Sequence, residues 1–349
     1  MKRSTRLVSW VFQEPLALLP LGYGTCAQSN PEFFNMADQA PILTIAIPTF
    51  NSAHFLPDAI GSIMRQDLDD FEILIFDNAS EDNTEDLIRS LQNRRIRYVR
   101  NLTNVGAQEN GDRCLANSRG RYVKFLCADD VLLDGVLRKQ LNILEKRPEV
   151  ALVTCGYLPT DHNLNIQGSW SAFPGIHPGR RIINFCLSRM TNAVGGPSNL
   201  MIRRVAATGI VADPTYRLLG DLKFSLQVLE RGAYANIDEP GILYRRHPNS
   251  EFALNCPPEI RMPEYLRLVN EFNWWNPLNC IVALLSGGFE SRQVVRDHWR
   301  QACSPGQMAR SVEAFADLVY QRSLRFFNKR KSAPARSWTR RESAGPRTL

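Results

Sequence analysis

The sequence predicts an α/β fold: a doubly wound, mostly parallel sheet with helices on both faces, followed by a helical C-terminal extension. Two observations lead to this prediction. Short apolar runs alternate with segments of helical periodicity between residues 42 and 155, and the connections between them are short, which is typical of βαβ units. The apolar runs are also nearly continuous, as expected for strands of a parallel sheet that is covered on both faces.

The predicted elements follow one another without long gaps. Pro48 ends the first strand, because proline cannot donate to a sheet ladder. Ser80 or Asp82 is expected to cap the second helix, and Asp134 the helix after the fourth strand. In order, the expected elements are a strand at 42–47, a helix at 55–65, a strand at 71–76, a helix ending at Leu91, a strand at 96–99, a helix at 106–118, a strand at 122–126, a helix at 133–146, a strand at 150–155, a strand-like run at 200–202 and a helix beginning near Asp221. Residues 157–180 lack a clear period and are expected to form a variable loop or hairpin.

The composition is that of a soluble globular protein, with 44% hydrophobic and 22% charged residues. The formal charge is +7, but the segment from Gln321 onward contributes +8, which leaves −1 for the rest of the chain. The basic character therefore belongs to the tail and says little about the active site. No apolar run reaches the ~18 residues that a membrane-spanning helix needs.

The eight cysteines and five histidines are dispersed along the chain, and no two cysteines form a CxxC pair. This pattern predicts neither a zinc site nor a disulfide framework. It favours a reducing compartment, so we expect a cytoplasmic protein. Residues 1–40 are expected to be a poorly ordered N-terminal extension, since Gln13, Glu14 and Pro15 interrupt the apolar stretch that a signal peptide needs.

Polar residues gather where three predicted strands end. The clusters are Thr49 with Asn51, Asp77 with Asn78, and Asp129 with Asp130. Carboxyl ends of strands in an open α/β sheet line one ligand-binding crevice, and adjacent carboxylates suit Mg²⁺ or Mn²⁺ carrying a substrate's phosphates. Each cluster taken singly also fits an ordinary turn. Neither GxGxxG after the first strand nor GxxxxGK[ST] occurs, which disfavours a dinucleotide dehydrogenase or a P-loop NTPase.

Five segments resemble, in order and separation, the successive motifs of family 2 glycosyltransferases. They are TIAIPTFN (44–51), FDNASEDNT (76–84), NVGAQEN (104–110), RGRYVKFLCADD (119–130) and GDLKFSLQVLERG (220–232). The resemblance covers about residues 42–250. It implies a GT-A type fold over residues 41–255, a nucleotide diphosphate sugar as donor, Mg²⁺ or Mn²⁺, and inversion at the anomeric carbon.

The resemblance also implies roles for single residues on the donor side. Thr49 and Asn51 lie where the family holds the nucleotide, and Asp77 matches the residue that hydrogen-bonds the base. Asn104 and Gly106 match the loop that leads into the donor-side helix. Judged by residue type and position alone, Asp77 could also cap a helix, and Asn104 and Gly106 could form a simple turn.

The metal motif and the catalytic base carry departures from the family. Asp129 and Asp130 match the end of the DxD motif, with Asp129 as the metal ligand, but Cys127 replaces the first acid. A soft thiolate is a poor ligand for a hard cation. Asp221 matches the general base of the ED motif, with Gly220 in place of its Glu. The alternative for Asp221 is a helix cap.

His247 closes a YRRH segment (244–247) that resembles the end of the family's domain. It is therefore a candidate contact for the metal or the diphosphate, although a lone surface histidine is more often inert. Gly111 and Asp112 are a further departure, because the family often has an Arg before an Asn in this helix.

The C-terminal third lies beyond the resemblance. Residues 256–328 are expected to form a helical extension, with helices at 261–272, 294–303 and 308–327, and residues 329–349 a disordered basic tail. The basic amphipathic helix at 308–327 fits peripheral contact with the inner face of an anionic membrane. Packing on the catalytic domain is the alternative, and no nucleic-acid-binding module is present.

Together these patterns predict a metal-dependent inverting glycosyltransferase that moves a sugar to a hydroxyl of a saccharide or lipid-linked acceptor. Two other classes stay open. The replacements at Cys127 and Gly220 fit a non-catalytic nucleotide-sugar-binding module. The basic tail fits a scaffold that docks to a membrane or a partner.

Overall fold

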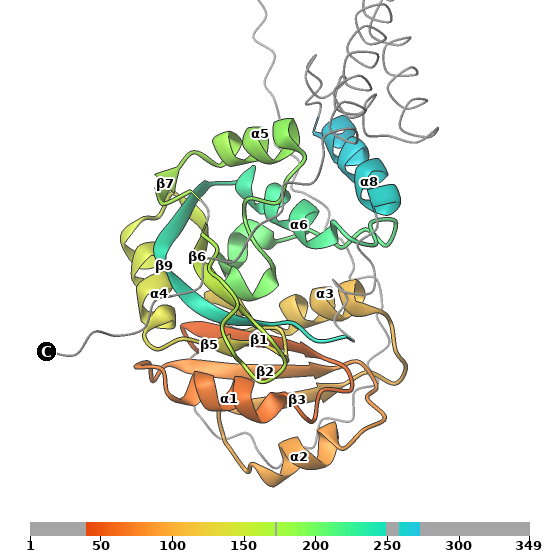
Figure 1. The fold of residues 1–349 in the computed structure, drawn as a ribbon. Helices are drawn as coiled ribbons and strands as arrows, with labels where there is room; N and C mark the ends of the chain where they lie inside the picture. Colours follow the sequence, from red (N-terminus) through yellow and green to blue (C-terminus); the bar gives the residue numbers. More distant parts are fainter. Residues whose placement is uncertain (1–39, 172, 249–257, 273–349) are drawn as a thin grey trace, which may run out of the picture. The chain divides into compact units, whose positions relative to one another are not determined.

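A computed structural model describes residues 40–171, 173–248 and 258–272 of the chain (Figure 1). The predictions for the N-terminal extension up to residue 39, for the helices at 294–303 and 308–327, and for the basic tail lie outside the described residues.

The described residues form one sheet of nine strands. Its order is β3-β2-β1-β4-β8-β6-β9-β5, with β7 paired to β9. The strands are β1 (Leu43–Thr49), β2 (Phe71–Asp77), β3 (Ile96–Arg100), β4 (Tyr122–Phe125), β5 (Val131–Leu132), β6 (Val150–Thr160), β7 (Gly175–His177), β8 (Met201–Arg203) and β9 (Ala233–Arg245). This arrangement confirms the predicted mostly parallel α/β sheet.

The first four strands in the order are parallel, and their carboxyl ends lie at one edge. Thr49 pairs with Asp77, and Asp77 with Arg100, so the ends of β1, β2 and β3 are level. Strand β8 breaks the parallel pattern, because it runs antiparallel to both β4 and β6. The short apolar run at 200–202 predicted this strand. Its direction was not predicted, because strand direction depends on how the chain connects β8 to its neighbours.

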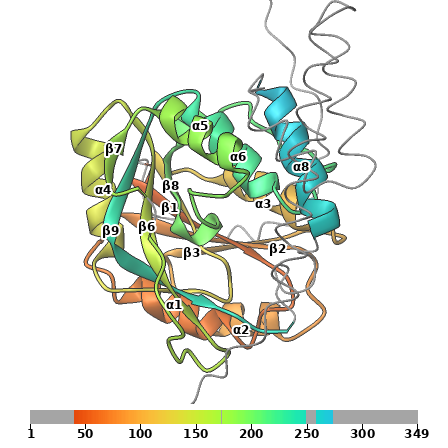
Figure 2. The same ribbon diagram turned by 45° about the horizontal axis from the view of Figure 1, so that its top comes forward.

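The helices cover both faces of the sheet (Figures 1 and 2). They are α1 (Leu56–Met64), α2 (Thr84–Ser90), α3 (Ala107–Asn117), α4 (Val136–Lys146), α5 (Gly179–Arg189), α6 (Gly220–Leu229) and α8 (Pro258–Glu271), with short 3₁₀ turns η2 (Pro197–Asn199) and η3 (Arg204–Ala207). Helix α8 confirms the helix predicted for 261–272. None of the described helices is both long enough and apolar enough to cross a bilayer.

Alternate residues of the central strands enter two separate hydrophobic cores. Ile45 and Ile73 pack with α1 and α4, whereas Ala46 and Leu74 pack on the other face with α5, α6 and α8. All four side chains are fully buried. This two-sided burial explains why the strands are continuously apolar in the sequence.

The predicted caps were wrong. Helix α4 has Gly135 at its N-cap, in a left-handed conformation with φ of 74°, and no side chain caps it. Helix α2 has Asn83 at its N-cap, again without a side-chain cap. Asp82 nevertheless accepts hydrogen bonds from the amide and the hydroxyl of Thr84, at 3.1 and 2.5 Å. A cap depends on the exact first residue of a helix, which periodicity does not specify.

Residues 157–180 were expected to form a variable loop or a hairpin, and residues 157–171 form a hairpin. Tyr157 bridges to Trp170, and Thr160 to Ile166, both antiparallel. The rings of Tyr157 and Trp170 stack with centroids 4.9 Å apart. The Trp170 indole therefore packs within its own hairpin.

Gly120 sits where β4 is about to enter the sheet, and a side chain has no space there. A Cβ at this position would lie 2.4 Å from the backbone nitrogen of Thr44. We expect Gly120→Ala to lower the free energy of unfolding by about 1–3 kcal/mol, because overpacking a backbone contact forces the strand to shift. Urea denaturation measures this change.

Gly111 in α3 is the matched control, because nothing lies within 4 Å of a Cβ built there. Gly111→Ala should raise the free energy of unfolding by roughly 0.5–1 kcal/mol, as in an exposed helix interior. Equal stabilities of the two variants would contradict the close approach of β4 to β1.

Candidate active site

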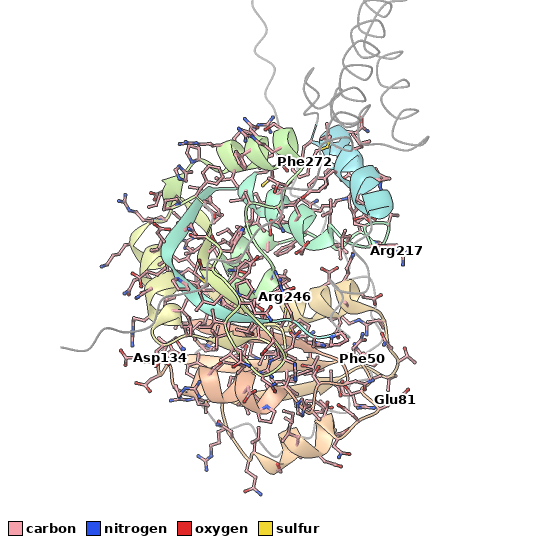
Figure 3. The ribbon with its side chains drawn as sticks, in the orientation of Figure 1. Phe50, Glu81, Asp134, Arg217, Arg246 and Phe272 are labelled. Carbon is pink, nitrogen blue, oxygen red and sulfur yellow. The ribbon has the colours of Figure 1, made fainter. Side chains whose placement is uncertain are left out.

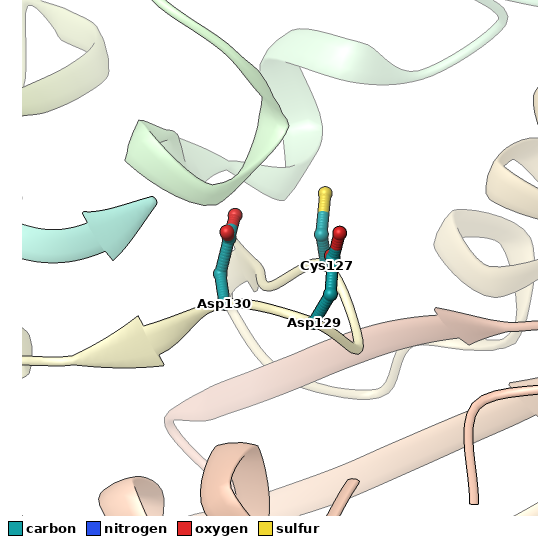
Figure 4. Close-up of side chains that lie close together, drawn as sticks. All are labelled: Cys127, Asp129 and Asp130. Atoms are coloured by element: carbon teal, nitrogen blue, oxygen red, sulfur yellow. The ribbon is translucent and has the colours of Figure 1, made fainter. Parts of the chain in front are cut away.

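The candidate site lies at the edge where the parallel strands end. Phe50 and Glu81, which follow the ends of β1 and β2, lie near each other at this edge (Figure 3). The loop after β4 carries Cys127, Asp129 and Asp130 to the same end of the sheet. One ligand atom from each of these three residues lies within 4.8 Å of the others (Figure 4). We call residues 127–130 the acidic loop.

The buried side chain of Asp130 holds the acidic loop in place. Its side chain is buried, with 1% of the residue exposed. One oxygen accepts a hydrogen bond from the Ser198 hydroxyl at 2.5 Å, and the other from the Arg245 amide at 3.0 Å. Burial, together with the charge of Asp129, raises the pKa of the Asp130 carboxyl. Asp130 therefore fixes the shape of the loop with both of its oxygens.

Asp129 points to the more open side of the loop, with a quarter of its side chain exposed. Its carboxylate lies 3.0 Å from Nε2 of His247. The His247 ring packs against Phe55, with ring centroids 4.8 Å apart. The structure thus brings together the two residues that were predicted as metal ligands, from positions 118 residues apart in the chain.

Asp221, the predicted general base, belongs to helix α6. It lies in the first turn, where its Oδ1 accepts a hydrogen bond from the Leu222 amide at 2.6 Å. Burial raises the pKa of the Cys127 thiol well above its usual value, and the charges of Asp130, Asp129 and Asp221 raise it further. Cys127 is therefore protonated at neutral pH, and the charge of Asp221 acts on its thiol together with those of Asp129 and Asp130.

Asp77 lies at the end of β2 but faces inward. It is fully buried and accepts four hydrogen bonds. The donors are the Ser80 amide and hydroxyl, the Tyr98 hydroxyl and the Arg100 guanidinium, at 2.5–2.9 Å. Tyr98 and Arg100 were not predicted as site residues, since nothing in the β3 sequence marks them as partners of a distant carboxylate. The contact between Asp77 and a base stays a prediction.

The remaining predicted donor residues shape loops around this edge. The buried Thr49 hydroxyl donates to the Ile47 carbonyl at 3.0 Å. Asn51 has a φ of 47°, and its side chain accepts from the Glu81 amide at 2.8 Å. The Asn51 contact holds the turn after β1 against the turn after β2, whereas the Thr49 contact stays within β1.

Asn104 and Gly106 define the turn into α3. The Asn104 carbonyl oxygen accepts hydrogen bonds from the Asn78 amide group at 2.8 Å and from the Gly106 backbone at 2.9 Å. Gly106 has a φ of 87°, and a Cβ there would meet nothing within 4 Å. The glycine therefore serves the backbone conformation and leaves open space above the turn.

Glu264 of α8 is a site residue that the sequence reasoning missed. Its side chain is buried, and it accepts hydrogen bonds from three successive backbone amides at 2.7, 3.0 and 2.7 Å. These amides belong to residues 217–219, directly before the helix that carries Asp221. An acidic residue directly before the mostly apolar run Tyr265–Val269 was the available signal.

Gln108 of α3 lies against Gly220, the first residue of α6. A Cβ on Gly220 would lie 2.6 Å from Nε2 of Gln108. The Gln108 amide group donates to the Tyr216 carbonyl in the same loop. The loop before α6 is therefore held between α3 and α8.

The family assignment follows from a comparison with known proteins. Residues 44–208 match the model of Glycosyl transferase family 2. This segment belongs to glycosyl transferase family 2. The match contains β1 to β8 and the acidic loop, and it stops before Asp221. The match confirms the resemblance of this segment to family 2 glycosyltransferases.

Named relatives agree with the family. The Bacillus subtilis putative teichuronic acid biosynthesis glycosyltransferase TuaG is 27% identical over 199 residues, which cover 56% of this chain and 75% of TuaG. A Campylobacter jejuni GalNAc(5)-diNAcBac-PP-undecaprenol beta-1,3-glucosyltransferase is 39% identical over 100 residues. An Escherichia coli UDP-Glc:alpha-D-GlcNAc-diphosphoundecaprenol beta-1,3-glucosyltransferase, WfgD, is 28% identical over 105 residues. The match to the Campylobacter jejuni enzyme covers 28% of this chain and 32% of that enzyme. The match to WfgD covers 30% of this chain and 42% of WfgD.

A solved structure shows the same fold. The crystal structure of S. aureus TarS in complex with UDP-GlcNAc superposes with a TM-score of 0.53. The alignment covers 73% of this chain and 70% of the TarS chain, at 16% identity. The predicted GT-A type of α/β fold is therefore confirmed.

We expect Glu264→Gln to loosen the loop before α6. The amide group of glutamine cannot accept all three backbone hydrogens, so at least one amide is left without a partner, which costs about 1–3 kcal/mol. Hydrogen–deuterium exchange of the amides of residues 217–219 should accelerate. Glu230→Gln, at the exposed end of α6, is the control and should leave the exchange unchanged. Unchanged exchange in Glu264→Gln would show that α8 does not hold this loop.

Proposed function

We propose that the protein transfers a sugar, with inversion, from a nucleotide diphosphate sugar to a hydroxyl of a saccharide or lipid-linked acceptor, using Mg²⁺ or Mn²⁺. One observation carries the proposal: at the carboxyl ends of the parallel strands, the Asp129 carboxylate lies 3.0 Å from Nε2 of His247, which is 118 residues away in the chain. Ligands bind at this edge in open α/β sheets.

The residues of the acidic loop fit a divalent cation. Asp129 supplies a hard oxygen donor, and His247 lies at hydrogen-bonding distance from it, so both are the proposed ligands. Both carboxylate oxygens of Asp130 accept hydrogen bonds within the protein, so we assign Asp130 to the support of the loop. The protonated Cys127 thiol is a weak ligand. A cation bound here neutralises the charge that builds on a leaving nucleoside diphosphate. An imidazole in the ligand set favours Mn²⁺ over Mg²⁺.

Asp221 is the proposed general base. It is half-buried in the first turn of α6, and Glu264 and Gln108 hold the loop that precedes it. A positioned carboxylate takes the proton of the acceptor hydroxyl as that oxygen attacks the anomeric carbon.

The donor is proposed to lie over the ends of β1 and β2. Two turns border this part of the sheet: the turn after β1, with Thr49 and Asn51, and the turn into α3, with Asn104 and Gly106. The buried Asp77 accepts a hydrogen bond from the Ser80 amide in the loop after β2. The printed name of WfgD includes UDP-Glc as donor and a diphosphoundecaprenol-linked acceptor. That name supports a nucleotide sugar and a lipid-linked acceptor for this chain as well, and the name of TuaG supports a role in polysaccharide biosynthesis for the cell envelope.

We also propose the domain limits and location predicted above: a catalytic domain at 41–255, a helical extension from 256, and a cytoplasmic protein. Helix α8 packs against the catalytic domain, since Tyr265, Leu268 and Val269 enter the same core as α5 and α6. The extension thus begins as part of the catalytic body. Peripheral contact of the basic tail with the inner face of a membrane remains a proposal.

A non-catalytic nucleotide-sugar-binding module is the second candidate, and Cys127 favours it. This protonated thiol stands where the family has a carboxylate, so the site has one charge fewer to hold a cation. A binding module would take up nucleotide with metal and show no turnover on any acceptor. A docking scaffold, the third class, would bind vesicles and no nucleotide.

Asp129→Asn tests the metal site. We expect Mn²⁺ to strengthen the binding of UDP or GDP to the wild-type chain, because the cation links the diphosphate to the carboxylate. The variant should lose most of this metal dependence, a change of at least about tenfold in dissociation constant measured by calorimetry with and without Mn²⁺. Asp134→Asn, an exposed carboxylate just beyond the loop, is the control. Metal-dependent binding that survives in Asp129→Asn would remove Asp129 from the site.

Asp221→Asn tests the base. The amide cannot take a proton, so the turnover number should fall about 10²–10⁴-fold while nucleotide affinity stays as in the wild type. Turnover is measured as release of nucleoside diphosphate from the donor. Glu230→Gln on the same helix should keep full activity. Full activity in Asp221→Asn would exclude the base, whereas a wild-type chain that binds donor without releasing diphosphate on any acceptor would favour the binding module.

A further inference from the structure

A second polar site lies at the opposite end of the central strands. Arg121, Arg203, Arg204, Val205 and Thr208 line a cavity of about 350 Å³, which we call the arginine pocket. Tyr122, at the start of β4, pairs with Arg203, at the end of β8. The acidic loop follows the other end of β4. The pocket and the candidate active site therefore lie at opposite ends of the parallel strands.

Two of the guanidinium groups are fixed by backbone carbonyls. Arg203 donates to the Leu144 carbonyl at 2.7 Å and to the Val150 carbonyl at 3.2 Å. Arg204 donates through Nε to the Gly120 carbonyl at 2.7 Å, a bond that does not use its two terminal nitrogens. Side chains held in this way are preorganised, so little entropy is lost when they bind a ligand.

Two of these positive charges lie beside the same aromatic ring. The guanidinium carbons of Arg121 and Arg203 both lie 5.4 Å from the centroid of the buried Tyr122 ring. A second cavity of about 190 Å³ shares Arg203 and Val205 with the first and adds Arg231. Arg231 donates to the carbonyls of Ala206 and Thr208, next to the pocket.

No carboxylate balances these charges in the part of the chain that the structure describes. None of the four arginines forms an ion pair there, and their hydrogen bonds go to carbonyl groups and to the Tyr122 hydroxyl. Glu149 lines the second cavity and pairs with Arg147 at 3.8 Å. Like charges gathered without a counter-ion repel one another, and an anion bound in the pocket would relieve that repulsion.

We propose that the arginine pocket binds a phosphate group. Guanidinium forks match the geometry of phosphate oxygens and bind them in pairs, and the Thr208 hydroxyl on the pocket wall is a further donor. A free phosphate compound and a lipid headgroup present the same chemistry. The side chain of Val205, which is 70% exposed at the pocket, suits a headgroup with adjoining acyl chain. The proposal does not depend on the glycosyltransferase activity.

The test uses the full chain in EDTA, so that metal-dependent nucleotide binding cannot contribute. Calorimetry with inorganic pyrophosphate probes the soluble source, and co-sedimentation with phosphatidylglycerol vesicles, against phosphatidylcholine vesicles, probes the headgroup. The variant is Arg121→Gln with Arg204→Gln, which spares the carbonyl contacts of Arg203. The control is Arg89→Gln with Arg138→Gln, which removes the same charge from another surface.

We expect the wild type and the control to bind at least one probe, and the pocket variant to bind it at least tenfold more weakly at unchanged melting temperature. Binding of pyrophosphate identifies a soluble phosphate compound as the source, and binding of vesicles alone identifies a headgroup. The proposal is overturned if the wild type binds neither probe, or if the pocket variant and the control bind equally. Asp129→Asn should bind the probes as the wild type does, which separates this result from a failure of the proposed activity.

Discussion

The buried carboxylate of Asp130 joins three segments that are distant in the chain. It links the acidic loop after β4 to Ser198 in η2 and to Arg245 at the end of β9. Ser198 also accepts from the Cys127 amide at 2.9 Å, and its carbonyl accepts from the fully buried Lys124 ammonium at 2.6 Å. An unpaired buried carboxylate is costly, so these contacts hold the loop in one shape. That shape turns Asp129 outward to His247.

Helix α8 helps to position the loop that leads to the candidate base. Asp221 lies beyond the segment that matches the family, and its helix begins at a loop gripped by Glu264 from one side and Gln108 from the other. Lys223 of α6 adds ion pairs to Asp213 and Glu271 at 2.8 and 2.7 Å. The candidate base is therefore supported by a helix outside the part of the chain that resembles the family.

Opposite charges occupy the two edges of the central sheet. The acidic loop follows the carboxyl end of β4, and the arginine pocket surrounds its amino end. The four residues of β4, each rising about 3.3 Å, separate the two sites. A cation at one edge and an anion at the other would each offset a local excess of charge. The formal charge of the whole chain does not reveal this separation, because most of the excess comes from the tail.

The sequence by itself determined the alternation of strands and helices between residues 42 and 155, the burial of both sheet faces and the position of the acidic residues at strand ends, but not α5 or the strands β5, β7 and β9. Each of these follows from local patterns, such as the continuous apolar run of β2 that ends at Asp77. The tertiary structure alone decided which way those residues face. Asp77 is enclosed by Tyr98 and Arg100 and Asp130 by Ser198, whereas Asp129 meets His247. Glu264 acquires its role only where α8 meets the loop before α6. These partners come from distant parts of the chain, and the pairing of a carboxylate with a donor dozens of residues away leaves no periodic trace in the sequence.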